Sequence, residues 1–264
     1  MNKASLRFCI LIAISSFAFF SCKKEHDLNK YPTNSRLLNL TRRIEALDSV
    51  GGGHSGVVLA TVNENFRFLY DNYNRVSQIY YTTNAVATPN TISTFTYAHD
   101  TIFKTIRSIN ETFMELDTFV TDYHGHITST YINGHVINYS YYGDLLVRVD
   151  STNGAAGYSN YTSYNGNFTA SKSSLGAGYD GRYTYFTDMP NRTGDYLYIR
   201  SMVQYGVNLY QNRSLINTID LPGYFTTATY VIDGDSKVTQ TTAITAYINK
   251  FSQRDTYDIQ YEKY

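Results

Sequence analysis

Residues 66–79 read FRFLYDNYNRVSQI, and this stretch has the form of one complete β-hairpin. Its first five residues are strand-forming, and Asp71 then opens a polar turn. Arg75 begins the return strand, to which Val76 and Ile79 give apolar character. Asp favours turns because its carboxylate accepts hydrogen bonds from downstream backbone N–H groups. The stretch therefore predicts two antiparallel strands joined at an aspartate.

The same pattern recurs along the chain as an aspartate with a basic residue four places on and a β-branched residue five places on. The four pairs are Asp71 and Arg75, Asp122 and His126, Asp144 and Arg148, and Asp233 and Lys237. We expect each aspartate to shape a turn and each basic residue to lie at the solvated start of the return strand. These eight residues are the predicted structural turn residues.

Further strand-like runs fill the intervals between these turns. They are residues 92–97, 103–109, 113–120, 136–142, 158–164 and 182–186. Asn133-Gly134 and Asn165-Gly166 separate some of them, and Asn-Gly between alternating residues is a strong hairpin signal. The pattern predicts an all-β fold with little helix: a large antiparallel meander that forms a single curved sheet, or an open barrel or sandwich.

Three segments are less regular. Residues 37–48 fit helical and strand spacing, and we favour a strand. The glycine-rich residues 51–56 predict a flexible loop, and the strand-like run after them argues against phosphate binding. Tyr196 to Ile199 is strand-like, whereas Met202 to Leu215 has neither period clearly, so a short helix or an irregular cover over one sheet end is expected there.

The N-terminus predicts export. Lys3 and Arg7 precede an apolar run that is too short to span a bilayer comfortably, which is typical of a signal peptide over residues 1–21. The run ends in Phe19-Phe20-Ser21-Cys22, which resembles a bacterial lipoprotein box and implies a lipidated Cys22, with acyl chains such as palmitate, as the mature first residue. Residues 22–36 are then a lipidated tether, and residues 37–264 form the β domain.

Composition agrees with this organisation. The chain has two cysteines, and Cys9 lies inside the predicted signal peptide, so the mature chain keeps Cys22 alone. Removing residues 1–21 removes Lys3 and Arg7, which leaves 20 basic against 22 acidic residues and a net charge of −2. A near-neutral chain lacks the basic patch of a nucleic-acid-binding protein, so no nucleic-acid partner is expected. The 27 tyrosines and 14 phenylalanines favour strands.

The hairpin of residues 66–79 resembles the YD repeats of RHS-type proteins. The whole mature chain resembles the uncharacterised YD-repeat-like lipoproteins of Gram-negative bacteria, in which a lipidated cysteine precedes a single β domain. The Tyr-Asp pair is intact only at Tyr70-Asp71, and His126 and Lys237 stand where the repeat has Arg. The resemblance implies a hairpin architecture and the lipid-bearing Cys22, but no catalytic or cofactor residues.

Candidate chemical sites are few. His124 and His126, with His135 nearby, could hold zinc, but two of them fall inside a recurring turn, so we expect no metal site. Asp117, Asp122 and Asp144 could supply paired carboxylates for glycoside hydrolysis, although turns explain them better.

Two tyrosine stripes are the remaining feature, and they could bind sugar rings or a protein, or pack the core. They are Tyr139 with Tyr141, and Tyr158 with Tyr161 and Tyr164.

We therefore expect a non-enzymatic, outer-membrane-anchored lipoprotein, on the periplasmic or the surface-exposed face, that binds or scaffolds at the cell envelope without a cofactor. Its expected partners are the membrane, through the lipid, and a glycan or an envelope protein. The alternative is a carbohydrate- or lipid-binding module that uses exposed tyrosine faces, and a glycoside hydrolase is a weaker possibility.

Overall fold

The computed structural model describes most of the chain from Ser35 to Tyr264. The described ranges are residues 35–50, 53–86, 88–109, 114–152, 157–191, 194–210, 212–235, 237–248 and 252–264. The predicted signal peptide and Cys22 lie outside the described residues. Ser35 and Arg36, which were expected to end the tether, belong to the first strand.

Within the described ranges the chain forms sixteen strands, one 3₁₀ turn and one α-helix. The strands of the first half are β1 (Ser35–Val50), β2 (Gly53–Tyr70), β3 (Val76–Thr83), β4 (Thr91–Ala98), β5 (Thr101–Ser108), β6 (Met114–Thr121), β7 (Ile127–Ile132) and β8 (His135–Tyr142). The second half comprises β9 (Leu145–Ser151), β10 (Gly157–Tyr164), β11 (Asn167–Ser173), η1 (Ala177–Tyr179), β12 (Gly181–Pro190), α2 (Tyr196–Tyr205), β13 (Ser214–Leu221), β14 (Tyr224–Ile232), β15 (Val238–Tyr247) and β16 (Ser252–Lys263).

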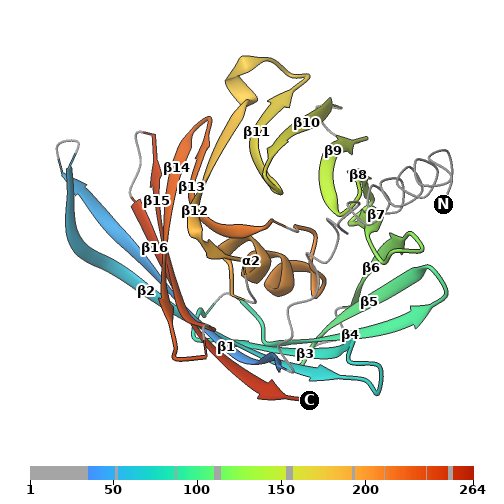
Figure 1. Ribbon diagram of the computed structural model, residues 1–264. Coiled ribbons are helices and arrows are strands. Elements are labelled where there is room, and N and C mark those ends of the chain that lie inside the picture. Colours follow the sequence, from blue (N-terminus) through green and yellow to red (C-terminus); the bar gives the residue numbers. More distant parts are fainter. Residues whose placement is uncertain are drawn as a thin grey trace, which may run out of the picture. The chain divides into compact units, whose positions relative to one another are not determined.

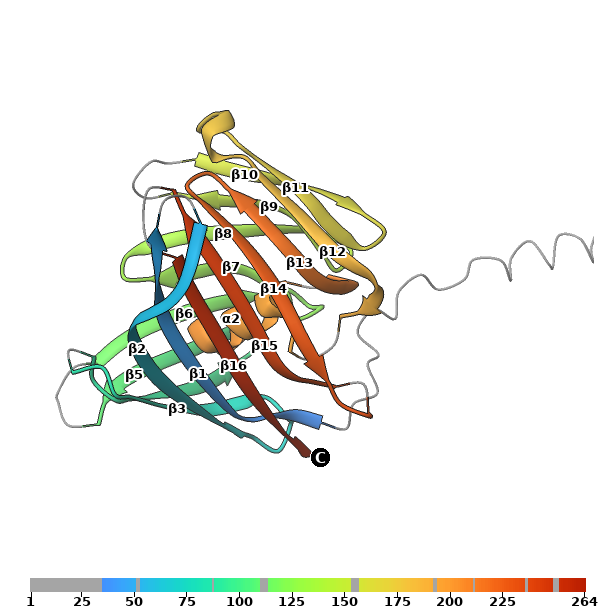
Figure 2. The same cartoon turned by 90° about the vertical axis from the view of Figure 1, so that its left-hand side faces the viewer.

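Each strand pairs antiparallel with its neighbours in sequence, and β1 pairs with β16, so the sheet closes into a barrel (Figure 1). At the closure Leu40 lies opposite Ile259, and Arg42 opposite Tyr257. The expected antiparallel meander is present, but it is a closed barrel and not an open sheet or a sandwich. Figure 2 shows the face on which β1 and β16 run side by side.

Several local expectations are confirmed. Residues 37–48 lie within β1, as favoured. Asn133 and Gly134 have φ of 51° and 73°, and Asn165 and Gly166 have 50° and 77°. Two successive positive φ values define the type I′ hairpin turn, for which Asn-Gly is the preferred sequence. The expected glycine-rich loop is shorter than predicted, because β2 begins at Gly53.

Side chains alternate between the barrel interior and its outer wall. On β4, Ser93 and Phe95 are buried while Thr94 and Thr96 are exposed. On β16, Tyr257 and Ile259 are buried, in contrast to the exposed Asp258. One hydrophobic cluster contains the inward residues of the wall together with those of α2. The core of this barrel is therefore its lumen.

Helix α2 lies inside the ring of strands (Figure 1). The expected strand at Tyr196 to Ile199 is wrong, because these residues form its first turn. Asp195 caps the helix, and Gly206 ends it with a φ of 76°. A sixteen-strand barrel encloses more space than its wall side chains fill, so an apolar helix can bury its surface there. Among the described helices, none has the length and apolarity to cross a bilayer.

Candidate functional site

Asp195 fixes the N-terminus of α2 to the barrel wall. Its Oδ2 accepts a hydrogen bond from Leu197 N at 3.1 Å, as an N-cap does. Its Oδ1 accepts from Ile216 N at 2.8 Å and from Tyr230 Oη at 3.2 Å. The side chain is 1% exposed, and this burial raises the pKa of Asp195 although the hydrogen bonds favour the ionised form. The helix thus enters the lumen in one fixed direction.

Lys104 fixes the other end of α2. Its Nζ donates to the backbone oxygen of Gln204 at 2.7 Å and lies 3.4 Å from Oδ2 of Asp117. A cation is favourable at the carbonyl end of a helix. Burial lowers the pKa of Lys104, against the opposing effect of Asp117, and burial raises the pKa of Asp117. Asp117, considered above as a hydrolase carboxylate, is therefore part of a structural ion pair in the wall.

A cavity of about 220 Å³ lies between α2 and the wall formed by β10 to β14. We call it the aromatic chamber. Its lining consists of Tyr161, Phe168, Tyr183, Leu197, Arg200, Ser201, Gln204, Tyr205, Tyr210, Ile219, Leu221 and Tyr224. Phe168 meets Tyr183 edge-to-face at a centroid distance of 4.9 Å, so the rings form a continuous surface. An apolar, aromatic cavity with a few polar groups is the usual form of a small-molecule site.

Polar groups of the chamber come mainly from the helix. Arg200 remains exposed to solvent although the barrel encloses it, and its guanidinium lies 5.7 Å from the ring centre of Tyr196. Burial works against the charge of Arg200, but the phenol oxygens of Tyr196, Tyr257 and Tyr224 outweigh it and raise the pKa. Burial also raises the pKa of Tyr224 itself. The phenols thus remain protonated donors around a cation.

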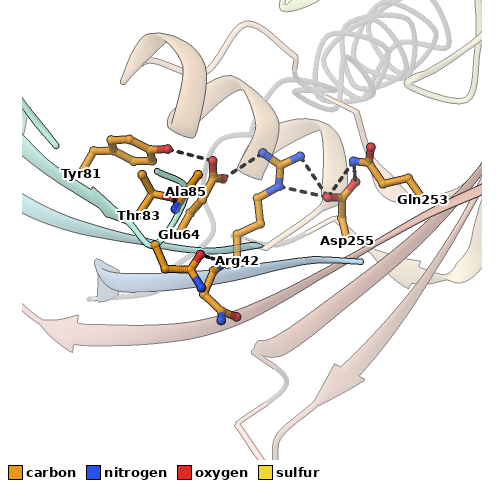
Figure 3. Close-up of polar contacts among 9 residues, drawn as sticks. Arg42, Glu64, Tyr81, Thr83, Ala85, Gln253 and Asp255 are labelled. Atoms are coloured by element: carbon orange, nitrogen blue, oxygen red, sulfur yellow. Dashed lines mark hydrogen bonds and ion pairs between the residues drawn. The ribbon is translucent and has the colours of Figure 1, made fainter. Parts of the chain in front are cut away.

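A second polar network lies inside the barrel where β16, β1 and β2 meet (Figure 3). Arg42 Nη2 lies 2.9 Å from Oδ1 of Asp255, and Nη1 lies 3.0 Å from Oε2 of Glu64. Glu64 also accepts from Tyr81 Oη at 2.9 Å, and Gln253 donates to Asp255. Burial opposes the charge on Arg42, but the neighbouring carboxylates and the Tyr257 phenol raise the pKa of Arg42. Because each charge in this network is paired, the ion pairs link β1 to β2 and to β16.

Asp71 lies at the tip between β2 and β3. Its Oδ1 accepts from the backbone N–H groups of Tyr73 and Arg75, and its Oδ2 accepts from Arg75 Nε at 2.8 Å. Burial opposes ionisation, but the hydrogen bonds and the Arg75 charge together lower the pKa of Asp71. The Arg75 guanidinium also lies 4.0 Å from the ring centre of Tyr97. The geometry is that of a turn and not of a ligand site.

The turn at Asp122 has the same backbone pattern, with His124 N and His126 N donating to its Oδ1. His126 connects it to the next turn, because its Nδ1 lies 3.0 Å from Asp122 Oδ2 and its Nε2 lies 3.1 Å from Asp144 Oδ1. Arg148 does not occupy the equivalent place and pairs with Asp150 instead. Among the described residues, no group of three or more His, Cys, Asp or Glu is positioned to hold a metal ion.

At the fourth turn, Asp233 accepts from Lys237 N at 2.8 Å. The ammonium group of Lys237 turns away and donates to Ser35 Oγ at the start of β1, at 2.8 Å. The basic residue therefore pairs with the aspartate of its own turn at Arg75 and His126, and with another partner at Arg148 and Lys237.

The first tyrosine stripe packs the core, which was one of the two expectations for it, whereas the second does not share one face. Tyr139 and Tyr141 both point inward and pack against the core. Tyr161 lines the chamber, whereas Tyr158 and Tyr164 are exposed. Residues three apart on a strand face opposite sides, so the second stripe divides between the lumen and the outer wall. Asp195, Lys104 and Arg200 were not predicted as site residues from the sequence. Asp195 and Gly206 could have indicated α2, because Asp is a preferred N-cap residue and Gly commonly ends a helix.

The comparisons concern the fold. The chain is similar to a porin-like protein from Bacteroides uniformis ATCC 8492, with a TM-score of 0.56 and 14% sequence identity over 84% of this chain and 97% of that one. A porin-like protein from Bacteroides vulgatus ATCC 8482 matches with a TM-score of 0.35 and 14% identity over 84% of this chain and 98% of that one. No family model matches the sequence, and no curated protein does. At this identity the first likeness shows a shared barrel fold alone.

Proposed function

We propose that this protein is a non-enzymatic binding protein of the cell envelope that takes a small, ring-containing molecule into the aromatic chamber. The observation that carries the proposal is the chamber itself: aromatic rings from the wall surround a few polar groups offered by a clamped helix. A volume of about 220 Å³ is below the usual range of drug-sized pockets, so it suits one ring and not a polymer.

A binding role is favoured over catalysis by the chemistry of the lining. Among the described residues that line the chamber there is no Asp, Glu, His or Cys. General acid–base catalysis depends mostly on those side chains, and a serine such as Ser201 acts as a nucleophile when one of them lies beside it as a base. The carboxylates considered for glycoside hydrolysis lie elsewhere: Asp117 pairs with Lys104, and Asp122 and Asp144 hold His126.

The outward side of β16 supports an aqueous environment along this strand, whereas the outward Met114 and Leu116 of β6 are exposed apolar residues. On β16 the outward positions from Arg254 to Glu262 are all polar, and eight residues of strand cover about 26 Å. A membrane-spanning barrel carries an outward apolar band of about 25 Å over this height. The outward Asp258 accepts from Gln240 at 2.7 Å, and Arg254 pairs with Glu45 at 2.6 Å.

We therefore propose that the lipid on Cys22 holds the protein at the outer membrane while the barrel remains in the aqueous phase. Carbonate washing of membranes tests this part. The wild-type protein is expected to stay with the membrane fraction, and the Cys22→Ser variant is expected to be released. Retention of the variant would mean that the wall and not the lipid makes the attachment.

A chamber-filling variant tests the binding role. Leu221 lines the chamber, so Leu221→Trp is expected to occupy it, whereas Phe225→Trp adds the same ring to an exposed position on β14. Both proteins are screened against neutral and acidic monosaccharides and small aromatic acids by native mass spectrometry and tyrosine fluorescence. Leu221→Trp should lose the ligand that the wild type and Phe225→Trp retain. Equal binding by both variants would remove the chamber as the site.

A further inference from the structure

Arg200 is a cation inside the barrel that is paired with no carboxylate among the described residues. Six other arginines of the described ranges form ion pairs: Arg36 with Glu262, Arg42 with Asp255, Arg43 and Arg254 with Glu45, Arg75 with Asp71, and Arg148 with Asp150. Arg200 contacts Tyr196, both over its ring and through a side-chain hydrogen bond. The cation therefore retains hydrogen-bonding capacity that no carboxylate in the chamber lining uses.

The position of Arg200 is held by its helix. Asp195 fixes the start of α2, Lys104 holds the carbonyl oxygen of Gln204, and Ser201 Oγ donates to Val207 O at 2.7 Å beyond the helix end. The clamped helix fixes the backbone of Arg200, and the contact with the Tyr196 ring restricts where its guanidinium lies. Such pre-organisation increases affinity because less order has to be imposed on binding.

The surroundings of Arg200 select for negative charge. The chamber lining contains this cation and several phenols, and none of its described members is a carboxylate. Burial raises the pKa of Tyr161 and of Tyr183, so both hydroxyls stay protonated and can donate. A guanidinium binds a carboxylate through two parallel hydrogen bonds, and such charge-assisted bonds are about twice as strong as neutral ones.

We propose that the ligand of the chamber is a single-ring organic acid whose carboxylate binds Arg200 while its ring packs on the tyrosines of the wall. This inference rests on the proposed binding function and specifies its ligand class. Uronic acids and aromatic carboxylates share this chemistry. The wall supplies the faces of Tyr161, Phe168 and Tyr183, whose edge-to-face arrangement leaves ring surface toward the cavity.

The test compares acids with their neutral counterparts on three proteins. Glucuronate is paired with glucose, and benzoate with benzyl alcohol, by isothermal titration calorimetry at low and at high salt. The proteins are the wild type, Arg200→Gln, and Arg107→Gln, which removes an exposed arginine of β5 on the outer wall. The wild type should bind at least one acid about ten-fold more tightly than its neutral counterpart, with a preference that salt weakens.

Arg200→Gln should lose about ten-fold in affinity for that acid and leave the neutral counterpart nearly unchanged, while Arg107→Gln should match the wild type. Arg200→Lys, which keeps the charge but not the two parallel bonds, should fall between. Circular dichroism checks that each variant folds.

Two results would overturn the inference: neither acid binds the wild type, or Arg200→Gln binds the acids as the wild type does. If a neutral compound still binds and Leu221→Trp abolishes that binding, the proposed function survives and the ligand class alone is wrong. If no compound binding is sensitive to Leu221→Trp, the binding function itself is wrong.

Discussion

Asp195→Ala is expected to destabilise the whole barrel, because Asp195 joins α2 to β13 and β14. The change removes the acceptor of Leu197 N and of Ile216 N, both in a fully buried region. Tyr230 keeps its bond to the Ile216 carbonyl oxygen at 2.8 Å. An orphaned buried donor costs about 1–3 kcal/mol, so two cost about 2–6 kcal/mol. Because the change also removes a carboxylate that burial disfavours, we expect a net loss of about 2–4 kcal/mol.

Urea titration followed by far-UV circular dichroism and tyrosine fluorescence measures this loss. The control is Asp188→Ala, an exposed residue of β12, for which a change within about 0.5 kcal/mol is expected. The dependence of the free energy of unfolding on urea should stay the same for both variants, since the surface exposed on unfolding is unchanged. If Asp195→Ala is as stable as Asp188→Ala, then α2 is not clamped as described.

The same residue gives a dependence on pH. Burial raises the pKa of Asp195, so the folded protein keeps its proton at pH values where the unfolded chain, with a pKa of about 3.9, has lost it. The folded state then binds more protons than the unfolded state, and the free energy of unfolding falls as the pH rises through this window. Asp195→Asn does not titrate. As the pH rises above about 4, the free energy of unfolding of the wild type should therefore fall relative to that of Asp195→Asn.

Two further predictions concern the wall. Lys104→Met should cost about 3–5 kcal/mol in urea titrations, because it leaves Asp117 charged and buried, and the double variant with Asp117→Leu should recover most of this loss. Additive losses in that cycle would mean that the two groups do not interact. Gly134→Ala should cost about 1 kcal/mol because Gly134 has a φ of 73°, whereas Gly234→Ala, also in open space and without a positive φ, should be close to neutral. Equal effects at the two glycines would contradict the type I′ turn.

The strands could be predicted from the sequence because the turn residues between them have local conformational preferences. Asp71 and the Asn-Gly pairs carry their own turn geometry, so each hairpin is specified within about a dozen residues. Closure of the barrel is different in kind, because it joins β1 to β16 across the whole chain. Arg36 and Glu262, which are hydrogen-bonded, lie 226 residues apart in the sequence, and no local sequence pattern predicts such a pairing.

The start of the helix and the chamber could not be predicted for a related reason, although a short helix or an irregular cover was expected from Met202 and α2 does extend to Tyr205. Tyr196 to Ile199 reads as a strand by composition, and β-forming residues take a helical conformation when the surroundings favour it. Here the cap at Asp195 and the apolar lumen decide the outcome, and the lumen exists only once the barrel has closed. The chamber rings likewise come from several strands, so the periodicity of any one strand shows only whether a tyrosine points inward. The spacing of three between Tyr158, Tyr161 and Tyr164 does not place them on one face of a strand, so Tyr161 points inward while the other two are exposed.

The interior of this barrel differs from that of a water-filled pore. A pore faces lipid with apolar side chains and leaves the wide space inside sixteen strands to water. Here the outward wall of β16 is polar, and the inward residues pack with α2 into one cluster. Burial within the lumen is then a main source of stability, and the wall and the helix depend on each other. The chamber is space that the two leave unfilled, which explains why its rings come mainly from the wall while its charge comes from Arg200 on the helix.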